Sequence, residues 1–330
     1  MIFEPEKENV FCGAKPMDYP RLLAPEEVRG KFMDLLGSFD PPSTPLNIRV
    51  TDEKTLDGDV VRQRVEYDVA PGETVPAYHM FKRGIPGDAK GVLSIHAHDG
   101  DQGFINGKDF NSRPDPNDPS QYSYRAALNG FRVLAPDALC FGERKLPWGY
   151  SEMFYSEVIM HAELCAKGSS LAWKSVWDNS RALEVLEQFG ASSIGCIGHS
   201  GGSIQSYILA AVNERVKAAA CFNSFTTLRH QFYKYRLAHC LYLYIPGMVT
   251  AGIDWDQVVA LTAPRPVFFG WGKKDEGTPE AMYRAFVDAI KKRCGENGWP
   301  VSVTAHEEDT EHDVTEGMLS EAMKFLKTHL

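Results

Sequence analysis

SSIGCIGHSGGSIQSYILAAV (residues 192–212) is the stretch of this chain whose pattern points most directly to a fold. Its first seven residues form an apolar run typical of a buried strand, and its last ten have the apolar spacing of a helix. Between the two, Gly198-His199-Ser200-Gly201-Gly202 fits the pattern G-x-S-x-G. The glycines let the backbone turn sharply without Cβ clashes. The stretch therefore predicts a strand–turn–helix unit with Ser200 at the turn.

Ser200 at such a turn has the setting of a catalytic nucleophile. Its hydroxyl is pushed out of the sheet, and the next backbone N–H groups open a helix, where partial positive charge favours an oxyanion. A serine hydroxyl is a weak nucleophile near neutral pH, so it needs a base that is oriented by an acid. In this kind of unit the acid and the histidine follow the serine in that chain order.

Two later segments supply these residue types, each after a strand-like run. KKDEGTPE follows the run at 264–272 and places Asp275 before a helix pattern. TEHDVTEGM follows the run at 300–308 and places His312 before the last helix pattern. We therefore expect Ser200, Asp275 and His312 to form a catalytic triad.

Three neighbouring residues are rivals for these roles. Glu276 adjoins Asp275, but we favour Asp275 as the acid. His306 lies inside a strand-like run, where a buried, packed histidine is expected, so we favour His312 as the base. His199 flanks the serine and is expected to pack over the turn.

The pattern outside this region predicts an α/β fold. Residues 46–53, 59–69 and 74–84 alternate apolar and polar side chains, as antiparallel strands with one wet face do. Short apolar runs then alternate with helical segments; they lie at 91–97, 131–138, 192–200, 216–224, 264–272 and 300–308. This alternation predicts a mostly parallel central sheet with helices on both faces, preceded by antiparallel N-terminal strands.

Segments outside this alternation suggest the domain organisation. Residues 1–45 are expected to form an N-terminal helical extension, with a short helix at 24–39, and residues 46–330 to form one domain. Two long, aromatic-rich segments, at about 142–173 and 224–257, follow strand ends. Because ligands bind at the carboxyl ends of parallel strands, we expect these segments to be helical insertions over the active site.

The motifs together resemble the α/β-hydrolase superfamily, and within it the branch of dienelactone hydrolases and acetyl-xylan-esterase-like proteins. There, a strand running into H-G-H-G or a relative forms the oxyanion loop, and SIHAHDGD (94–101) occupies that place. The segments that resemble this branch further are LAPDALCFGER (134–144), IGHSGGS (197–203), YIPGM (244–248) and APRPVFFGWGKKD (263–275). The resemblance covers about residues 45–330.

This resemblance implies an α/β-hydrolase fold and a serine carboxylic-ester hydrolase that works through an acyl-enzyme. The implied substrate is a small acyl ester, with an acetylated carbohydrate as one candidate. Hydrolysis of an amide or a lactone stays open, because a triad alone does not choose among acyl-transfer substrates.

The oxyanion is expected to be held by the backbone N–H groups of Gly201 and His98, with Asp99 as the substitute for His98. Ala97 stands where relatives often have glycine, and a positive φ would be strained at an alanine. His96 is expected to hydrogen-bond neighbouring loops as a structural histidine.

A metal-dependent hydrolase is the more distant alternative. His96, His98 and Asp101 resemble the first half of H-x-H-x-D-H, but position 102 is glutamine and no second histidine cluster follows. We therefore expect neither a metal nor another cofactor. A binding protein that retained the fold is a third reading, which an unreactive Ser200 would favour.

Further side chains are candidates around the site. The residues expected to line the substrate pocket are Trp148, Tyr155, Tyr233, Tyr244 and Met248. Asp137 and Arg144 are expected to form an ion network that holds their loop rather than to act on substrate.

Composition argues against nucleic acid and membranes as partners, and the resemblance implies a small-molecule ester as the partner. A formal net charge of −9 argues against nucleic acid, and no apolar run reaches the length of a membrane span. The start of the chain lacks the pattern of a signal peptide, and the 7 cysteines are scattered singly, so we expect a cytoplasmic protein with reduced thiols. Assembly into a homo-oligomer stays open.

Overall fold

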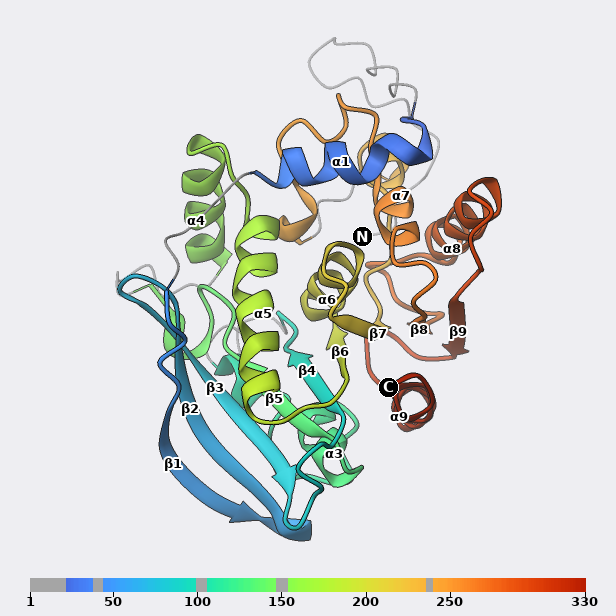
Figure 1. The fold of residues 1–330 in the computed structure, drawn as a ribbon. Helices are drawn as coiled ribbons and strands as arrows, with labels where there is room; N and C mark the ends of the chain where they lie inside the picture. Colours follow the sequence, from blue (N-terminus) through green and yellow to red (C-terminus); the bar gives the residue numbers. More distant parts are fainter. Residues whose placement is uncertain (1–21, 38–43, 99–105, 147–153, 236–239) are drawn as a thin grey trace.

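The computed structural model describes residues 22–37, 44–98, 106–146, 154–235 and 240–330 (Figure 1). In these ranges, nine strands form one sheet in the order β1-β2-β3-β5-β4-β6-β7-β8-β9. The strands are β1 Arg49–Leu56, β2 Val60–Ala70, β3 Glu73–Lys82, β4 Gly91–Ile95, β5 Arg132–Pro136, β6 Ile194–His199, β7 Val216–Phe222, β8 Val267–Gly272 and β9 Val303–Glu308. Pairing is antiparallel from β1 to β5 through β2 and β3, and parallel from β5 to β9. The predicted sheet is confirmed.

Helices cover both faces of the sheet (Figure 1). The helices of the described ranges are α1 Pro25–Leu36, α3 Tyr122–Leu128, α4 Phe154–Ala166, α5 Leu171–Gln188, α6 Gly201–Val212, α7 Trp255–Ala260, α8 Glu280–Glu296 and α9 Glu316–His329. Helices α1, α5, α6, α7 and α8 share one hydrophobic cluster with one face of the sheet, while α3 and α9 share a second cluster with the other face. The sheet is therefore the middle layer of three.

Strand β7 shows why the central runs are apolar throughout. Ala219 and Cys221 belong to the cluster on one face, and Ala218 and Ala220 belong to the cluster on the other. Successive side chains of a strand point to opposite faces, so a strand covered on both faces needs apolar residues at every position.

Helix α1 lies in the segment predicted as an N-terminal helical extension, and it packs into the main core. The Phe32 ring meets the Trp255 ring of α7 edge-on, with 5.9 Å between centroids. The Arg29 guanidinium donates to the Leu261 carbonyl at 3.1 Å. Residues 25–36 therefore share the hydrophobic cluster of the large domain.

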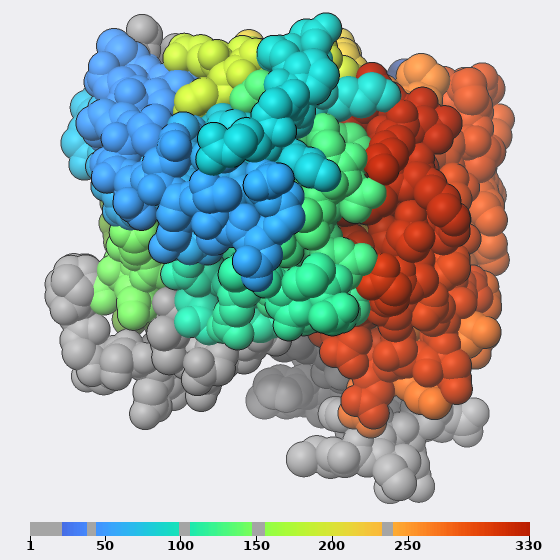
Figure 2. All heavy atoms as spheres, turned by 90° about the horizontal axis from the view of Figure 1, so that it is seen from below, coloured from blue at the N-terminus to red at the C-terminus, as the bar shows by residue number. Residues whose placement is uncertain are grey.

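The last helix closes the opposite face of the sheet. Figure 2 shows the C-terminal segment in red against the green segment that contains α3. Arg125 of α3 donates to both carboxylate oxygens of Glu316 on α9, at 2.9 and 2.6 Å. The chain end is thus tied to the first crossover connection.

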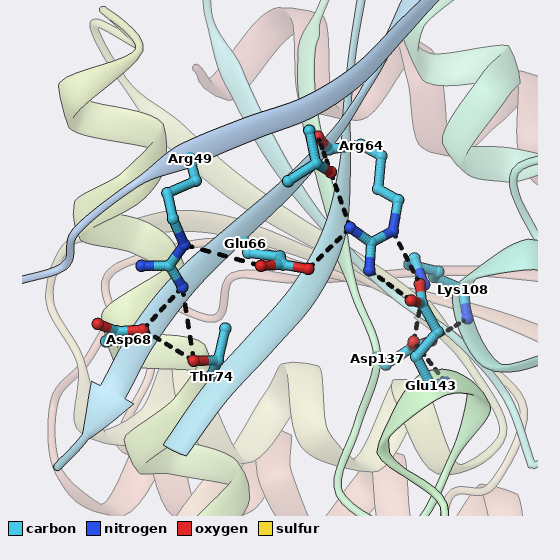
Figure 3. Close-up of polar contacts among 9 residues, drawn as sticks. Arg49, Arg64, Glu66, Asp68, Thr74, Lys108, Asp137 and Glu143 are labelled. Carbon is cyan, nitrogen blue, oxygen red and sulfur yellow. Dashed lines mark hydrogen bonds and ion pairs between the residues drawn. The ribbon is translucent and has the colours of Figure 1, made fainter. Parts of the chain in front are cut away.

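Polar side chains on the antiparallel strands form a ladder of ion pairs (Figure 3). Arg49 of β1 reaches Asp68 at 3.0 Å and Glu66 at 3.7 Å, both on β2. Arg64 continues the ladder by contacting Glu66 at 2.8 Å. The ladder lies on the wet face that the alternating sequence predicted for these strands.

The ladder ends at a buried network behind the β5 loop (Figure 3). The Lys108 ammonium contacts Asp137 at 2.7 Å, and the backbone N–H of Glu143 donates to the same carboxylate at 3.0 Å. Arg144 donates to Asp178 of α5 at 2.9 Å. This is the loop-holding ion network expected for Asp137 and Arg144.

None of the helices in the described ranges combines the length and the apolar composition needed to cross a membrane.

Candidate active site

Ser200 sits on a strained turn between β6 and α6. Its φ of 55° and ψ of −118° lie in a region that non-glycine residues rarely adopt. The Ser200 N–H donates to the carbonyl of Phe222 on β7 at 2.9 Å, which holds the turn against the neighbouring strand. Ser200 therefore stands at the carboxyl end of a central strand, as predicted.

Glycine is required at two positions around this turn by close backbone approach. A Cβ at Gly202 would strike the carbonyl oxygens of Ile95 and His96. A Cβ at Gly198 would strike the Gly202 carbonyl. The glycines thus allow α6 to begin directly against the end of β4, so that the Gly201 N–H opens the helix beside the predicted oxyanion loop.

Asp275 and His312 meet at the ends of the neighbouring strands β8 and β9. The His312 Nδ1 lies 2.8 Å from Oδ2 of Asp275. The other oxygen of Asp275 accepts from the backbone N–H groups of Gly277 and Thr278 at 2.8 and 3.2 Å. The carboxylate is buried, whereas 37% of the His312 side chain is exposed. Because Nδ1 is engaged by Asp275, Nε2 is the His312 nitrogen that this pair does not use.

His199 packs between the serine turn and the base. Its buried ring lies 4.9 Å from the ring of His312. Burial, reinforced by repulsion from His312, lowers the pKa of His199 to about 3. It is therefore a neutral packing group near pH 7, as predicted.

His306 differs from its prediction. It lies in β9, but its side chain is 30% exposed and bonds Glu308 at 2.7 Å. The expectation of a buried, packed histidine was wrong, because β9 is the edge strand of the sheet and this face of it is incompletely covered.

Asn223 is a site residue that the sequence analysis missed. It is fully buried just after β7, with a φ of 58°. Its Oδ1 accepts from the Gly272 N–H at 3.0 Å, and its Nδ2 donates to the Asp313 carbonyl at 3.0 Å. One amide thus ties the loop that carries the acid to the loop that carries the base. The sequence pattern that could have indicated Asn223 is a polar residue at the end of β7, the strand next to β6, which leads into Ser200.

His96 has the structural role predicted for it. Its Nδ1 lies 2.9 Å from the Ala97 carbonyl, and its Nε2 accepts from the Ala138 N–H at 3.0 Å. With both ring nitrogens engaged, His96 offers no free nitrogen to a metal. Within the described ranges, no group of three or more His, Cys, Asp or Glu side chains has the arrangement of a metal site. Asp101 lies outside those ranges.

The backbone of Ala97 is not strained by a positive φ. It is buried, and it is not among the described non-glycine residues with a positive φ. The loop therefore passes this point without the conformation that would favour glycine.

His98 makes a contact that the sequence did not suggest. Its Nε2 lies 3.0 and 3.1 Å from the two carboxylate oxygens of Glu157, a buried residue of α4. Burial lowers the pKa of His98, but the Glu157 carboxylate and, after it, Cys240 together raise this pKa well above its ordinary value of 6.5. His98 is therefore a cation near neutral pH. The alternative donor, Asp99, lies outside the described ranges.

Comparison with solved structures gives the architecture a name. A glucuronoyl esterase from Solibacter usitatus superposes with a TM-score of 0.64 over 91% of this chain and 92% of its own, at 16% identity. A candidate acetyl xylan esterase from Bacteroides fragilis gives 0.66 over 86% and 74%, also at 16% identity. A promiscuous esterase from a marine bacterial metagenome gives 0.60 over 92% and 91%, at 16% identity.

The chain has the α/β-hydrolase fold. At such low identity the likeness concerns the fold alone. No protein-family model and no curated protein matches the sequence.

In this fold, both long insertions contribute residues near the loop that is predicted to hold the oxyanion. Helix α4 brings Glu157 from the first, and the second brings Cys240, whose sulfur lies 3.8 Å from Nε2 of His98. Among the predicted pocket residues, Tyr244 stacks on Phe232 at 5.5 Å and Met248 is buried in the main core. The side chains of Trp148, Tyr155 and Tyr233 lie outside the described part of the chain.

A polar cleft opens beside the acid–base pair. It has a volume of about 520 Å³ and is lined by residues 274–277 together with Glu311 and His312. Lys274, Glu276 and Glu311 give this cleft charged walls, which suit a hydroxyl-rich group better than an alkyl chain.

Proposed function

We propose that this protein is a serine carboxylic-ester hydrolase in which Ser200, His312 and Asp275 form the triad. The observation that supports this most is the 2.8 Å contact between His312 and Asp275, beside the strained turn that carries Ser200. A strained nucleophile, a base and a buried acid at the carboxyl ends of nearby strands are the parts that acyl transfer requires.

The proposed cycle has two halves. Ser200 Oγ attacks the ester carbonyl while Nε2 of His312 takes the hydroxyl proton, and the tetrahedral oxyanion rests on the N–H groups of Gly201 and His98. Collapse breaks the bond to the alcohol, which leaves with the proton from His312. Water then attacks the acyl-enzyme by the same route and releases the acid. Asp275 orients the imidazole and stabilises its cationic form throughout.

The proposed substrate is a small acyl ester of a polar alcohol, with an acetylated carbohydrate as the leading candidate. The charged walls of the cleft beside His312 support a polar alcohol. The names of the similar solved structures, an acetyl xylan esterase and a glucuronoyl esterase, support a carbohydrate ester. Lactones and amides could use the same triad and belong in the same substrate panel.

The first test compares wild type with Ser200→Ala on p-nitrophenyl acetate. We expect the variant to lose at least about a thousand-fold in kcat, because no nucleophile remains. A fluorophosphonate probe should label wild type at Ser200 and leave the variant unlabelled. Full activity in Ser200→Ala, or an unreactive Ser200 in wild type, would contradict the triad.

Two further arms separate the alternatives. A panel from acetate to octanoate esters, with acetylated xylo-oligosaccharides, should favour short acyl groups on polar alcohols. Activity that disappears with a chelator and returns with zinc would instead favour the metal reading with His96, His98 and Asp101.

We propose that the enzyme is cytoplasmic, because the cysteines in the described part of the chain are free thiols. These are Cys140, Cys165, Cys196, Cys221, Cys240 and Cys294. Light scattering after size exclusion would decide whether it is a homo-oligomer.

A further inference from the structure

His98 links the oxyanion loop to an insertion helix through a buried ion pair. Glu157 is 1% exposed, and both of its carboxylate oxygens lie within 3.1 Å of Nε2 of His98. The two residues come from the end of β4 and from α4, 59 positions apart. Burying a carboxylate costs free energy unless it is paired, so this contact needs a charged partner.

The Nδ1–Cε1 edge of the His98 ring lies against the start of α6. A Cβ added to Gly201 would collide with Nδ1 and Cε1 of His98. This ring edge therefore rests on Gly201, whose backbone N–H is a proposed oxyanion donor. Nε2 faces Glu157, and Nδ1 faces the serine turn.

Two aromatic rings cover much of the His98 side chain, of which 19% stays exposed. The Phe141 ring meets His98 edge-on at 5.3 Å, and the Tyr242 ring lies 5.9 Å away. Cys240 lies near Nε2, but burial raises the pKa of its thiol, which stays neutral. Glu157 is thus the largest of the contributions that favour the cationic form of His98, and Cys240 adds to it.

We propose that His98 is a further catalytic residue, whose imidazolium side chain stabilises the oxyanion in addition to the backbone N–H groups. Glu157 is its positioning residue. The inference rests on the proposed ester hydrolysis, because it concerns the oxyanion of that reaction. The polarity of the pair fits this role: its positive member lies beside Gly201, and its negative member lies on the far side of the ring.

A fixed positive charge at this place acts mainly on the transition state. The ester carbonyl carries little charge before attack and close to a full negative charge afterwards. In a water-poor site, a preorganised cation stabilises that charge far more than it would in water. Loss of the cation should therefore lower kcat and leave KM nearly unchanged.

The decisive variant is Glu157→Gln, which keeps the shape and a hydrogen-bonding group while removing the carboxylate charge. Without it, burial favours neutral His98, so kcat on p-nitrophenyl acetate at pH 8 should fall about ten-fold or more, with KM within about two-fold. His98→Gln, which cannot carry a charge, should reproduce the loss. Glu163→Gln, at an exposed carboxylate of the same helix, should keep wild-type kcat.

The dependence of kcat on pH distinguishes this role from a purely structural one, because a contact that only holds α4 in place would not change the pH profile. His98 is charged below its raised pKa and loses the charge as pH rises through it, so wild-type kcat should fall on the alkaline side. Glu157→Gln should move that fall to lower pH, and His98→Gln should remove it. Among the residues that the structure describes, the other titratable groups facing His98 are His96, Cys240 and Tyr242, and burial holds all three neutral.

All rates are to be divided by the number of fluorophosphonate-reactive sites, so that misfolded protein does not count. If wild type hydrolyses the ester with a reactive Ser200, but both variants keep its kcat and alkaline limb, the role of His98 alone is overturned. If wild type has neither activity nor a reactive Ser200, the proposed function falls and this role falls with it. A lower melting temperature at unchanged kcat per reactive site would make the pair a structural strap, which also overturns the role.

Discussion

At the level of single residues, Gly202 shows how little space the serine turn leaves. Its Cα faces the carbonyl oxygens of Ile95 and His96, which are backbone atoms and cannot rotate away. A side chain here must push α6 away from the end of β4, and that shift would carry Ser200 and the Gly201 N–H with it.

We therefore predict that Gly202→Ala lowers the free energy of unfolding by about 1–3 kcal/mol, the usual cost of overpacking. Esterase activity should fall more than stability alone explains. Urea denaturation and the rate on p-nitrophenyl acetate measure the two effects.

Gly295→Ala is the matched control. Gly295 lies in helix α8, and nothing stands within 4 Å of the position its Cβ would take. Alanine should stabilise this helix by about 0.5–1 kcal/mol and leave activity unchanged. Equal behaviour of the two variants would contradict the close-approach explanation for Gly202.

At the level of elements, the ends of β6, β7, β8 and β9 have to be aligned for three separate loops to meet. Asn223, at the end of β7, bonds the loop after β8 through Gly272 and the loop after β9 through Asp313. Its own backbone N–H donates to Gly270 of β8 at 2.9 Å. The spacing between acid and base therefore depends on this buried amide.

Asn223→Gly isolates the amide, because glycine adopts the observed φ of 58° without strain. We predict a loss of kcat on the order of 10–100-fold, since small shifts of catalytic groups are costly. Circular dichroism should show retained secondary structure, and kcat should be measured per reactive serine.

Asn129→Ala offers the comparison for that variant. Asn129 follows α3, away from the strand ends, and its amide donates to the Arg125 carbonyl. Its removal should leave kcat unchanged. If Asn223→Gly also kept wild-type kcat, the amide would have no positioning role.

The two insertions could be located from the sequence, but their contacts could not be predicted. Their aromatic composition and their position after strand ends indicated segments over the site. The contact of Glu157 with His98 was not predictable, because it depends on where α4 lies in space and not on any local spacing.

For the whole molecule, buried histidines set the response of stability to acid. Burial lowers the pKa of His79 to about 3, and burial together with His312 lowers that of His199 to about 3. The unfolded chain takes up protons at these sites near pH 6.5, whereas the native state does not until about pH 3. The stability they contribute is thus complete above pH 6.5 and declines as pH falls.

Each such histidine should reduce the free energy of unfolding by up to about 1.4 kcal/mol per pH unit in this window. Below pH 6, protonation of Asp254 offsets the destabilising effect of one histidine. Burial and the charge of Asp256 raise the pKa of Asp254 to about 6, so the native state binds this proton at a higher pH than the unfolded chain does. We predict a net decline from pH 6.5 to pH 4.5, measured by urea denaturation. His79→Gln should make the decline shallower by about one proton, and a flat wild-type curve would contradict the assignment.

Features that depend on local spacing could be predicted from the amino-acid sequence alone. The apolar runs predicted the sheet, the glycines around Ser200 predicted the turn, and the order of Asp275 and His312 after their strands predicted a pair that lies 2.8 Å apart. Each of these follows from a period or a turn chemistry that a few neighbouring residues carry.

Contacts between side chains far apart in the chain could be seen only in the folded structure. The packing of α4 against the loop after β4 pairs His98 with Glu157, and the alignment of four strand ends lets Asn223 bond two loops. Pairing and burial depend on distances in the folded molecule. Those distances cannot be inferred from local patterns when the two residues lie 59 positions apart in the chain.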